Sequence, residues 1–508
     1  LSGQFLQGNS DRTLIGVVCL LLTALLVAVI WWNDVLPMQD YPQHLYMVAV
    51  IDGYHDPAND WAERLEVRNL LAPYRLLYLV HHGLGQYFGV VAAGKVIVSG
   101  YILLVGLLAL LLIGGREPGG APWCVLLLFP LSFHPIYYYG FLNFTLSIPV
   151  LLIALLHLES MTSGRNHRLR FLAHLLLLFC LLLLHPYTLL VYIALAAASV
   201  VLLVRTRQQL ILIASCVFVA LCLYLVWQGI EKQSAIKSLS IAAMNFRWWS
   251  LDWNLDFLAL PFVGMRLDAD RESWLAITWI TLMLVVLIGA WRGRGFAPFR
   301  YYFLVLGCLA LAGYFLLPFS VFTPIRYTYF SVRLFPIALF LMVAFLATLH
   351  LGRASGRILG GLSVLLTLNS IYLHHSVASE AEACLPLFAG MGPAGDVLPL
   401  IGKTPSAELD PFFYSRFYQH FPFYYHVLKG GGVNPDLFNN TLVPVAFVAG
   451  KRPGLPPGNE FYRWPEYADQ YDYIITRNVS AHLSRQLQEE TRRLDVVGPW
   501  AVYQLSDK

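Results

Sequence analysis

The run LIGVVCLLLTALLVAVIWW, residues 14–32, decides the fold class, because it carries no charged side chain and is long enough to cross a lipid bilayer. A spanning helix needs about 20 predominantly apolar residues for a hydrocarbon core of about 30 Å. Of the 508 residues in the chain, 58% are hydrophobic and 13% are charged, which is far more apolar than a soluble protein of this length. Only helices and closed barrels satisfy their backbone in lipid. The sequence therefore predicts an all-α polytopic membrane protein.

About eleven spanning helices are predicted from the apolar runs that lie between charged or Gly/Pro-rich breaks. The expected spans lie near residues 14–32, 91–113, 121–137, 143–158, 170–184, 187–204, 208–228, 273–291, 300–318, 333–350 and 357–374. The segment from Tyr74 to Val90 is also apolar, but Arg75, His81 and His82 weaken it as a span. We interpret it as a short interfacial or re-entrant helix.

Arginines in alternate short loops set the predicted orientation through the positive-inside rule. The turns near residues 138–142 and 185–186 contain no arginine. The amino terminus is accordingly expected in the cytoplasm and the carboxy-terminal region outside, as in a protein of a bacterial inner membrane. The arginines that carry this prediction are Arg116, Arg165, Arg168, Arg170, Arg205, Arg207, Arg292, Arg294, Arg300, Arg353 and Arg357.

The predicted orientation divides the chain into a transmembrane domain, residues 1–374, with outer loops 33–72 and 229–272, and an extracytoplasmic domain, residues 375–508. In the second domain charge rises and apolar runs shorten to strand length. A small α/β domain is expected there, and it could also bind a protein partner. Its predicted elements are strands at Asp396–Ile401, Tyr473–Thr476 and Trp500–Leu505 and an amphipathic helix at Ser480–Arg493.

Several function classes are excluded or disfavoured by the composition and the motifs. The net charge of +4 is spread over short loops, so nucleic acid is not expected as a partner, whereas membrane lipids are. Six of the seven cysteines lie inside apolar runs, which argues against a disulfide framework. No GxGxxG, Walker A, HExxH or GxSxG pattern occurs in a suitable context.

Asp40 is the leading candidate for a catalytic residue. It lies in the segment NDVLPMQDYPQHL, residues 33–45, directly after the first apolar run, and the pattern from His44 onward predicts the start of a helix. A carboxylate at this position could act as a general base, with His44 beside it, or the two could bind a divalent metal ion. The alternative is that Asp40 caps an interfacial helix.

Other polar residues are expected at the same outer level of the membrane. Ionisable groups near a membrane interior usually face a cavity and mark function, although interfacial hydrogen bonding is the alternative for each histidine. A basic side chain flanked by aromatic residues at the membrane edge suits a phosphate or diphosphate group, and snorkelling is the alternative. The candidate substrate-binding residues are His134, Tyr139, Asn143, His185, Arg326, Tyr327 and Arg333.

The arrangement resembles the GT-C class of integral membrane glycosyltransferases, which includes polyprenyl-phosphate-dependent mannosyl- and aminoarabinosyltransferases. The resemblance lies in a first helix, an outer loop with an early aspartate, many spans and a carboxy-terminal outer domain. The segments DYPQH, residues 40–44, and YGFLNF, residues 139–144, also resemble segments of bacterial multi-pass proteins assigned near this class. The Asp-Asp or Asp-Glu pair of better known branches is absent at Asp40-Tyr41.

The resemblance implies transfer of a sugar from a polyprenyl-phosphate donor to an acceptor on the outer face of the membrane. Asp40 would be the acidic catalytic residue, and Arg326 with Arg333 would neutralise the leaving phosphate. Two alternatives stay open: a polysaccharide ligase or polymerase, and a non-catalytic membrane subunit whose outer region binds a partner. The short loop before the span at 333–350 counts against the ligase.

Overall fold

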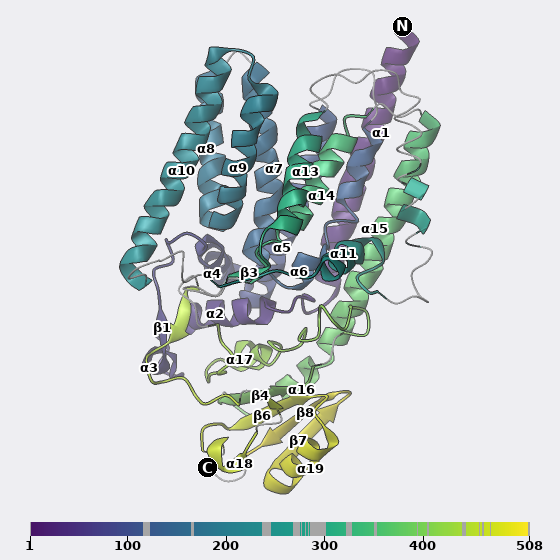
Figure 1. Cartoon of the computed structure of the whole chain (residues 1–508). Helices are drawn as coiled ribbons and strands as arrows, with labels where there is room; N and C mark the ends of the chain where they lie inside the picture. Colours follow the sequence, from purple (N-terminus) through teal and green to yellow (C-terminus); the bar gives the residue numbers. More distant parts are fainter. Residues whose placement is uncertain are drawn as a thin grey trace. The chain divides into compact units, whose positions relative to one another are not determined.

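The computed structural model is a mostly helical membrane protein with a small mixed sheet near its carboxy terminus (Figure 1). It divides into two compact units, and α1, α5, α6, α7 and α15 have residues in both. Unit 1 comprises Leu1–Ala28, Ser99–Ile136 and Asn143–Tyr372, and unit 2 comprises Val29–Val98, Tyr137–Leu142 and Leu373–Lys508. The structure describes residues 2–114, 122–163, 167–235, 245–267, 275, 277–279, 281–282, 284, 301–321, 328–349, 353–393, 395–403, 406–438, 443–456, 458–459, 462–467 and 469–505.

Six helices among the described residues are long and apolar enough to cross a membrane. They are α1 (Ser2–Trp32), α5 (Val90–Gly114), α7 (Leu142–Ser163), α9 (Pro186–Leu203), α10 (Arg207–Ala235) and α15 (Arg353–Glu382). Shorter apolar helices are α8 (His167–Leu184), α13 (Tyr301–Leu316) and α14 (Leu334–Leu346). Large apolar side chains such as Phe218 of α10 are exposed, as expected for helices that face lipid.

One expected span is not a single helix. Residues 121–137 contain the short 3-10 helix η1 (Trp123–Leu128), a turn, and α6 (Pro135–Tyr138). Pro130 and Pro135 explain the break, because proline removes a backbone donor and clashes with the preceding helical turn. The expected span at 273–291 lies mostly outside the described residues.

Unit 1 packs its helices through close contacts between small residues and aromatic rings. Helices α8, α9 and α10 pack side by side, and α13 packs against α14 and α9 (Figure 1). A Cβ atom on Gly356 or Gly360 of α15 would lie 2.3 Å or 2.6 Å from the ring of Trp123. Such glycines let a helix approach its neighbour closely in the absence of a hydrophobic driving force between helices. The remaining elements of unit 1 are β2 (Phe246–Arg247), α11 (Leu251–Ala259), η3 (Leu260–Phe262) and β3 (Ser320–Val321).

Unit 2 combines the loop that follows α1 with the carboxy-terminal region. The loop forms α2 (Tyr41–Gly53), α3 (Trp61–Arg64), β1 (Leu65–Val67) and α4 (Leu76–Phe88). Strand β1 pairs antiparallel with β5 (Val445–Phe447), and α2 packs against α4 and α17 (Phe423–Lys429). Helix α4 fits the short helix expected at Tyr74–Val90, since it has 13 residues and spans only about 20 Å.

The carboxy-terminal sheet has the strand order β4-β6-β8-β7. Strands β4 (Val397–Ile401), β6 (Tyr473–Arg477) and β8 (Trp500–Gln504) match the expected strands, and α19 (Ala481–Glu490) matches most of the expected helix. The sequence interpretation missed β7 (Arg492–Val497), whose first residues had been assigned to that helix. Strand β4 is parallel to β6, whereas β6–β8 and β8–β7 are antiparallel. Two short helices, α16 (Leu385–Gly390) and α18 (Trp464–Tyr467), complete unit 2.

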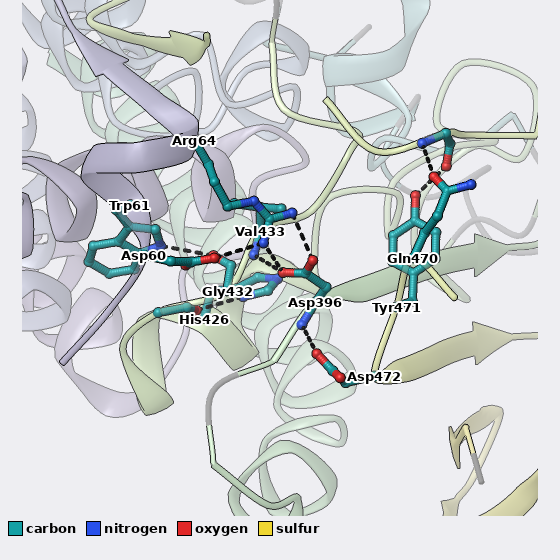
Figure 2. A network of polar contacts seen from close by, with 12 residues as sticks. Asp60, Trp61, Arg64, Asp396, His426, Gly432, Val433, Gln470, Tyr471 and Asp472 are labelled. Atoms are coloured by element: carbon teal, nitrogen blue, oxygen red, sulfur yellow. Dashed lines mark hydrogen bonds and ion pairs between the residues drawn. The ribbon is translucent and has the colours of Figure 1, made fainter. Parts of the chain in front are cut away.

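A polar network joins the loop after α1 to this sheet (Figure 2). Arg64 at the end of α3 makes a bidentate ion pair with Asp396, with both N–O distances at 2.7 Å, and a second ion pair of 2.9 Å with Asp60. Asp396 also accepts a hydrogen bond of 3.0 Å from the Val433 amide, and its own amide donates to Asp472 over 2.8 Å. These contacts tie segments more than 300 residues apart into one folded unit.

Candidate functional site

The backbone around Asp40 is fixed by the neighbouring segment Tyr137–Leu142 of unit 2. Asp40 occupies the N-cap position of α2, but its side chain makes no capping hydrogen bond. Its amide donates to the carbonyl of Tyr139 over 3.2 Å, and the amide of Gln39 donates to the carbonyl of Tyr138 over 2.9 Å. Helix α2 begins at Tyr41, three residues before the expected start at His44, because Pro42 is well tolerated in a first helical turn. The carboxylate is therefore not used as a helix cap.

Gly140 allows the segment after α6 to approach Asp40 closely. Its φ is +84°, a conformation that favours glycine. A Cβ atom at this position would lie 2.8 Å from the backbone nitrogen of Asp40 and 3.0 Å from that of Tyr41. Any other residue would therefore strain its own backbone and push against the start of α2.

The Asp40 side chain lies beside a histidine from the carboxy-terminal region. Asp40 is only 7% exposed. Its Oδ1 lies 3.4 Å from Nε2 of His420, and Nδ1 of the same ring lies 3.3 Å from Oδ2 of Asp436. The imidazole thus lies between two carboxylates. His420 and Asp436 were missed at the sequence level because they are about 380 and 396 residues from Asp40 along the chain, and no spacing rule relates such positions.

His44 occupies the next turn of α2 and has a different environment. Its Nδ1 accepts a hydrogen bond of 2.6 Å from the hydroxyl of Tyr78 on α4. Burial, together with the nearby His81 and His420, lowers the pKa of His44 to about 3. Burial also lowers the pKa of His81 to about 4. Both rings are neutral at neutral pH and can accept a hydrogen bond.

Tyr139 belongs to the same unit and has a packing role in this structure. Its hydroxyl donates to the carbonyl of Phe413 over 2.7 Å, and its ring stacks on Tyr414 with the centroids 5.0 Å apart. Tyr139 and Gly140 thereby link the segment after α6 to both Asp40 and the carboxy-terminal region.

A second polar group lies in unit 1. Nη1 of Arg333, which precedes α14, is 3.4 Å from Nε2 of His185, which precedes α9. The guanidinium of Arg333 lies 5.7 Å from the ring centroid of Phe144, and the rings of Phe144 and His185 are 5.3 Å apart. A cation supported by an imidazole and an aromatic face suits an anionic ligand.

Two other sequence candidates of unit 1, His134 and Asn143, are buried near the starts of helices. His134, which precedes α6, packs edge-on against Phe340 with the ring centroids 6.5 Å apart. Asn143 is the second residue of α7. Arg326 and Tyr327 lie outside the described residues.

A metal site built on Asp40 and His44 was a further expectation. Within the described part of the chain, no group of three or more His, Cys, Asp or Glu side chains is arranged to hold a metal ion.

Two solved structures match this chain over nearly its full length. The structure of ArnT from Cupriavidus metallidurans in the apo state superposes with a TM-score of 0.54 at 11% sequence identity, covering 95% of this chain and 97% of ArnT. The structure of the same protein bound to undecaprenyl phosphate gives a TM-score of 0.47 at 10% identity, with 97% of each chain covered.

The chain has the ArnT fold. ArnT is a GT-C polyprenyl-phosphate-sugar glycosyltransferase, so the resemblance expected from the sequence is confirmed at the level of the fold. No protein-family model matches the sequence, and the search of curated proteins found no match.

Proposed function

We propose that this protein is a membrane glycosyltransferase that moves a hexosyl or pentosyl group from a polyprenyl-phosphate-linked donor to an acceptor on the outer face of the membrane. The observation that carries the proposal is the buried Asp40 carboxylate, which stands at the start of α2 without capping it, in a chain with the ArnT fold. A carboxylate placed in this way can accept a proton from an acceptor hydroxyl.

In the proposed reaction the acceptor oxygen attacks the anomeric carbon of the sugar. The bond between that carbon and the phosphate oxygen breaks, and the polyprenyl phosphate leaves with the electron pair. Asp40 takes the proton of the acceptor. His44 assists as a neutral hydrogen-bonding group, consistent with its pKa of about 3.

The unit 1 group is proposed to bind the donor. Arg333 would neutralise the phosphate as it leaves, with His185 beside it, and electrostatic stabilisation of this kind is commonly the largest catalytic effect. His134, Tyr139 and Asn143 are retained as proposed substrate-binding residues, together with Arg326 and Tyr327.

The proposed orientation places the amino-terminal end of α1 in the cytoplasm of a bacterial cell. It puts the chain regions 33–72, 229–272 and 375–508 outside, where unit 2 could also bind a protein partner. The distribution of arginines among the loops supports it.

The proposal is tested with Asp40→Asn in membranes that contain the overproduced protein. We expect the variant to lose about 100- to 10,000-fold of the rate at which polyprenyl-phosphate sugars are consumed, the usual contribution of a general base. Mass spectrometry of extracted lipids measures donor and polyprenyl phosphate directly. Asp34→Asn is the matched control, because Asp34 is an exposed aspartate in the same loop. Unchanged consumption in Asp40→Asn would instead favour a non-catalytic subunit.

A further inference from the structure

His420 and Asp436 are held against Asp40 by contacts that start from the first turn of α2. Gln43, three residues after Asp40, donates from its side-chain amide to the carbonyl of Asp436 over 2.9 Å. Its amide oxygen accepts a hydrogen bond of 3.0 Å from the Phe438 amide. The Gln43 amide also contacts the His420 ring. The segment that carries Asp436 is thus anchored to the helix that begins beside Asp40.

His420 and Asp436 are also held in place by contacts within the carboxy-terminal region. Gln419 donates to both carboxylate oxygens of Asp436, over 3.2 Å and 2.9 Å. The rings of His420 and Phe438 lie 5.4 Å apart in an edge-on arrangement. His420 is 6% exposed, so its ring is held in a largely dry environment between the two carboxylates.

The charges around the ring favour its protonated form. Burial by itself lowers the pKa of His420, and so does the charge of Arg416. The hydrogen bond to Asp436 and the charges of Asp436 and Asp40 outweigh them, so the pKa is raised overall. His44 also interacts with His420, and it is neutral at neutral pH because its own pKa is lowered to about 3. A protonated imidazole has an N–H on each side and can donate to both carboxylates.

We propose that His420 is a positioning residue for Asp40: its Nε2–H donates to the Asp40 carboxylate and fixes the orientation of that group, while Asp436 fixes the ring through Nδ1. The inference rests on the proposed function, because it gives Asp40 the role of general base. It adds that the carboxy-terminal region supplies part of the acid–base site. The pair His420–Asp436 then acts on Asp40 as an orienting carboxylate acts on a catalytic histidine.

The first test is kinetic and uses the full-length protein in detergent with a polyprenyl-phosphate sugar that the wild type consumes. His420→Gln is expected to lower kcat about 10- to 100-fold with little change in KM for the donor, because removing an orienting partner typically costs this much. Asp436→Asn should act in the same direction, and Asp436→Glu should restore part of the rate. His426→Gln is the matched control: it is another buried histidine of unit 2, bonded to the carbonyl of Gly431 over 3.1 Å. Wild-type kcat in His420→Gln would overturn the proposal.

A second test does not depend on activity. In protein labelled with ¹⁵N-histidine, the ring signals of His420 are assigned from their loss in His420→Gln and are followed at constant pH. Asp40→Asn should shift the His420 Nε2 signal and leave the His426 signals unchanged. An unmoved His420 signal would overturn the contact even if the Asp436 variants failed to fold. If the wild type transferred no sugar but the signal moved, the contact would stand and only the proposed function would fail.

Discussion

The two polar groups of this protein differ in charge and in the way the chain builds them. In unit 2, Asp40 and Asp436 flank His420, so an imidazole ring with a raised pKa lies between two carboxylates. In unit 1, Arg333 lies beside His185 and the ring of Phe144, so a cation is supported by an imidazole and an aromatic face. The first group suits the movement of a proton, and the second suits an anion.

The difference assigns separate tasks to the two units in the proposed reaction. Proton transfer from the acceptor would depend on unit 2, and recognition of the donor phosphate would depend on unit 1. Substitutions in the two groups should therefore have different kinetic signatures, and similar signatures would contradict the division.

Removal of the Arg333 charge should give the largest of the remaining effects. Arg333→Met is expected to lower kcat/KM for the donor about 100- to 1000-fold, the loss typical when a group that stabilises developing charge is deleted. Arg333→Lys should retain part of the rate, because it keeps the charge but loses the planar fork. Arg205→Met is the control, since Arg205 is an exposed arginine of the same unit. Steady-state kinetics over a range of donor concentrations measure the effect. An Arg333→Met enzyme with unaltered donor dependence would contradict the phosphate role.

A substitution at Gly140 tests whether the backbone of Asp40 must be held in place. Gly140→Ala should lower kcat about 10- to 100-fold, because a displacement of about 1 Å at a catalytic group can cost this much. Gly89→Ala is a matched control: Gly89 also has a positive φ, +78°, but a Cβ there meets nothing within 4 Å. Both variants carry backbone strain, but only the new Cβ atom of Gly140→Ala would clash with the backbone of Asp40. Equal loss of activity in the two variants would show that the strain alone is responsible.

The smallest expected effect is on the pH dependence of folding stability. His44 is buried and its pKa is lowered from 6.5 to about 3, so between these values the unfolded chain binds a proton that the folded chain excludes. Folding stability contributed by His44 is therefore lost as the pH falls through this window. His420, whose pKa is raised, has the opposite sign: its contribution is present below pH 6.5 and is lost as the pH rises through its folded pKa.

His44→Gln should therefore make the midpoint of thermal unfolding less sensitive to pH between about 6.5 and 4. Differential scanning fluorimetry of the detergent-solubilised protein measures it. His55→Gln provides the comparison, because His55 is an exposed histidine of the same unit. A steeper pH dependence in His44→Gln would contradict the lowered pKa.

Much of the fold follows from the sequence because its signals are local. The apolar runs predicted the helices, with α5, α8, α9 and α13 close to the expected bounds, whereas α1 begins at Ser2, well before the expected start at residue 14. Three carboxy-terminal strands were also predicted, since short apolar runs between turn residues are a local pattern. The segment RRLDVV at Arg492–Val497 was misassigned in part, because its pairing with β8 is a tertiary feature.

Only part of the candidate site was predictable from the sequence. Asp40, His44 and Tyr139 fall in one unit, and His185 and Arg333 form a contact in the other. His420 and Asp436 could not be found in this way, because folding of the carboxy-terminal region onto α2 creates their contact with Asp40. Their local signal is weak: His420 is one of two histidines in the aromatic run FYQHFPFYYH, residues 417–426, which is equally typical of a packed core.

The most direct test of the central claim compares donor binding with donor turnover in the purified protein. Polyprenyl-phosphate-linked hexoses and pentoses are offered with acceptor lipids, and polyprenyl phosphate release is followed, since it is the common product of every such donor. We predict that the wild type releases polyprenyl phosphate and that Asp40→Asn binds the same donor with similar affinity but releases almost none. Release by Asp40→Asn at the wild-type rate would contradict the account.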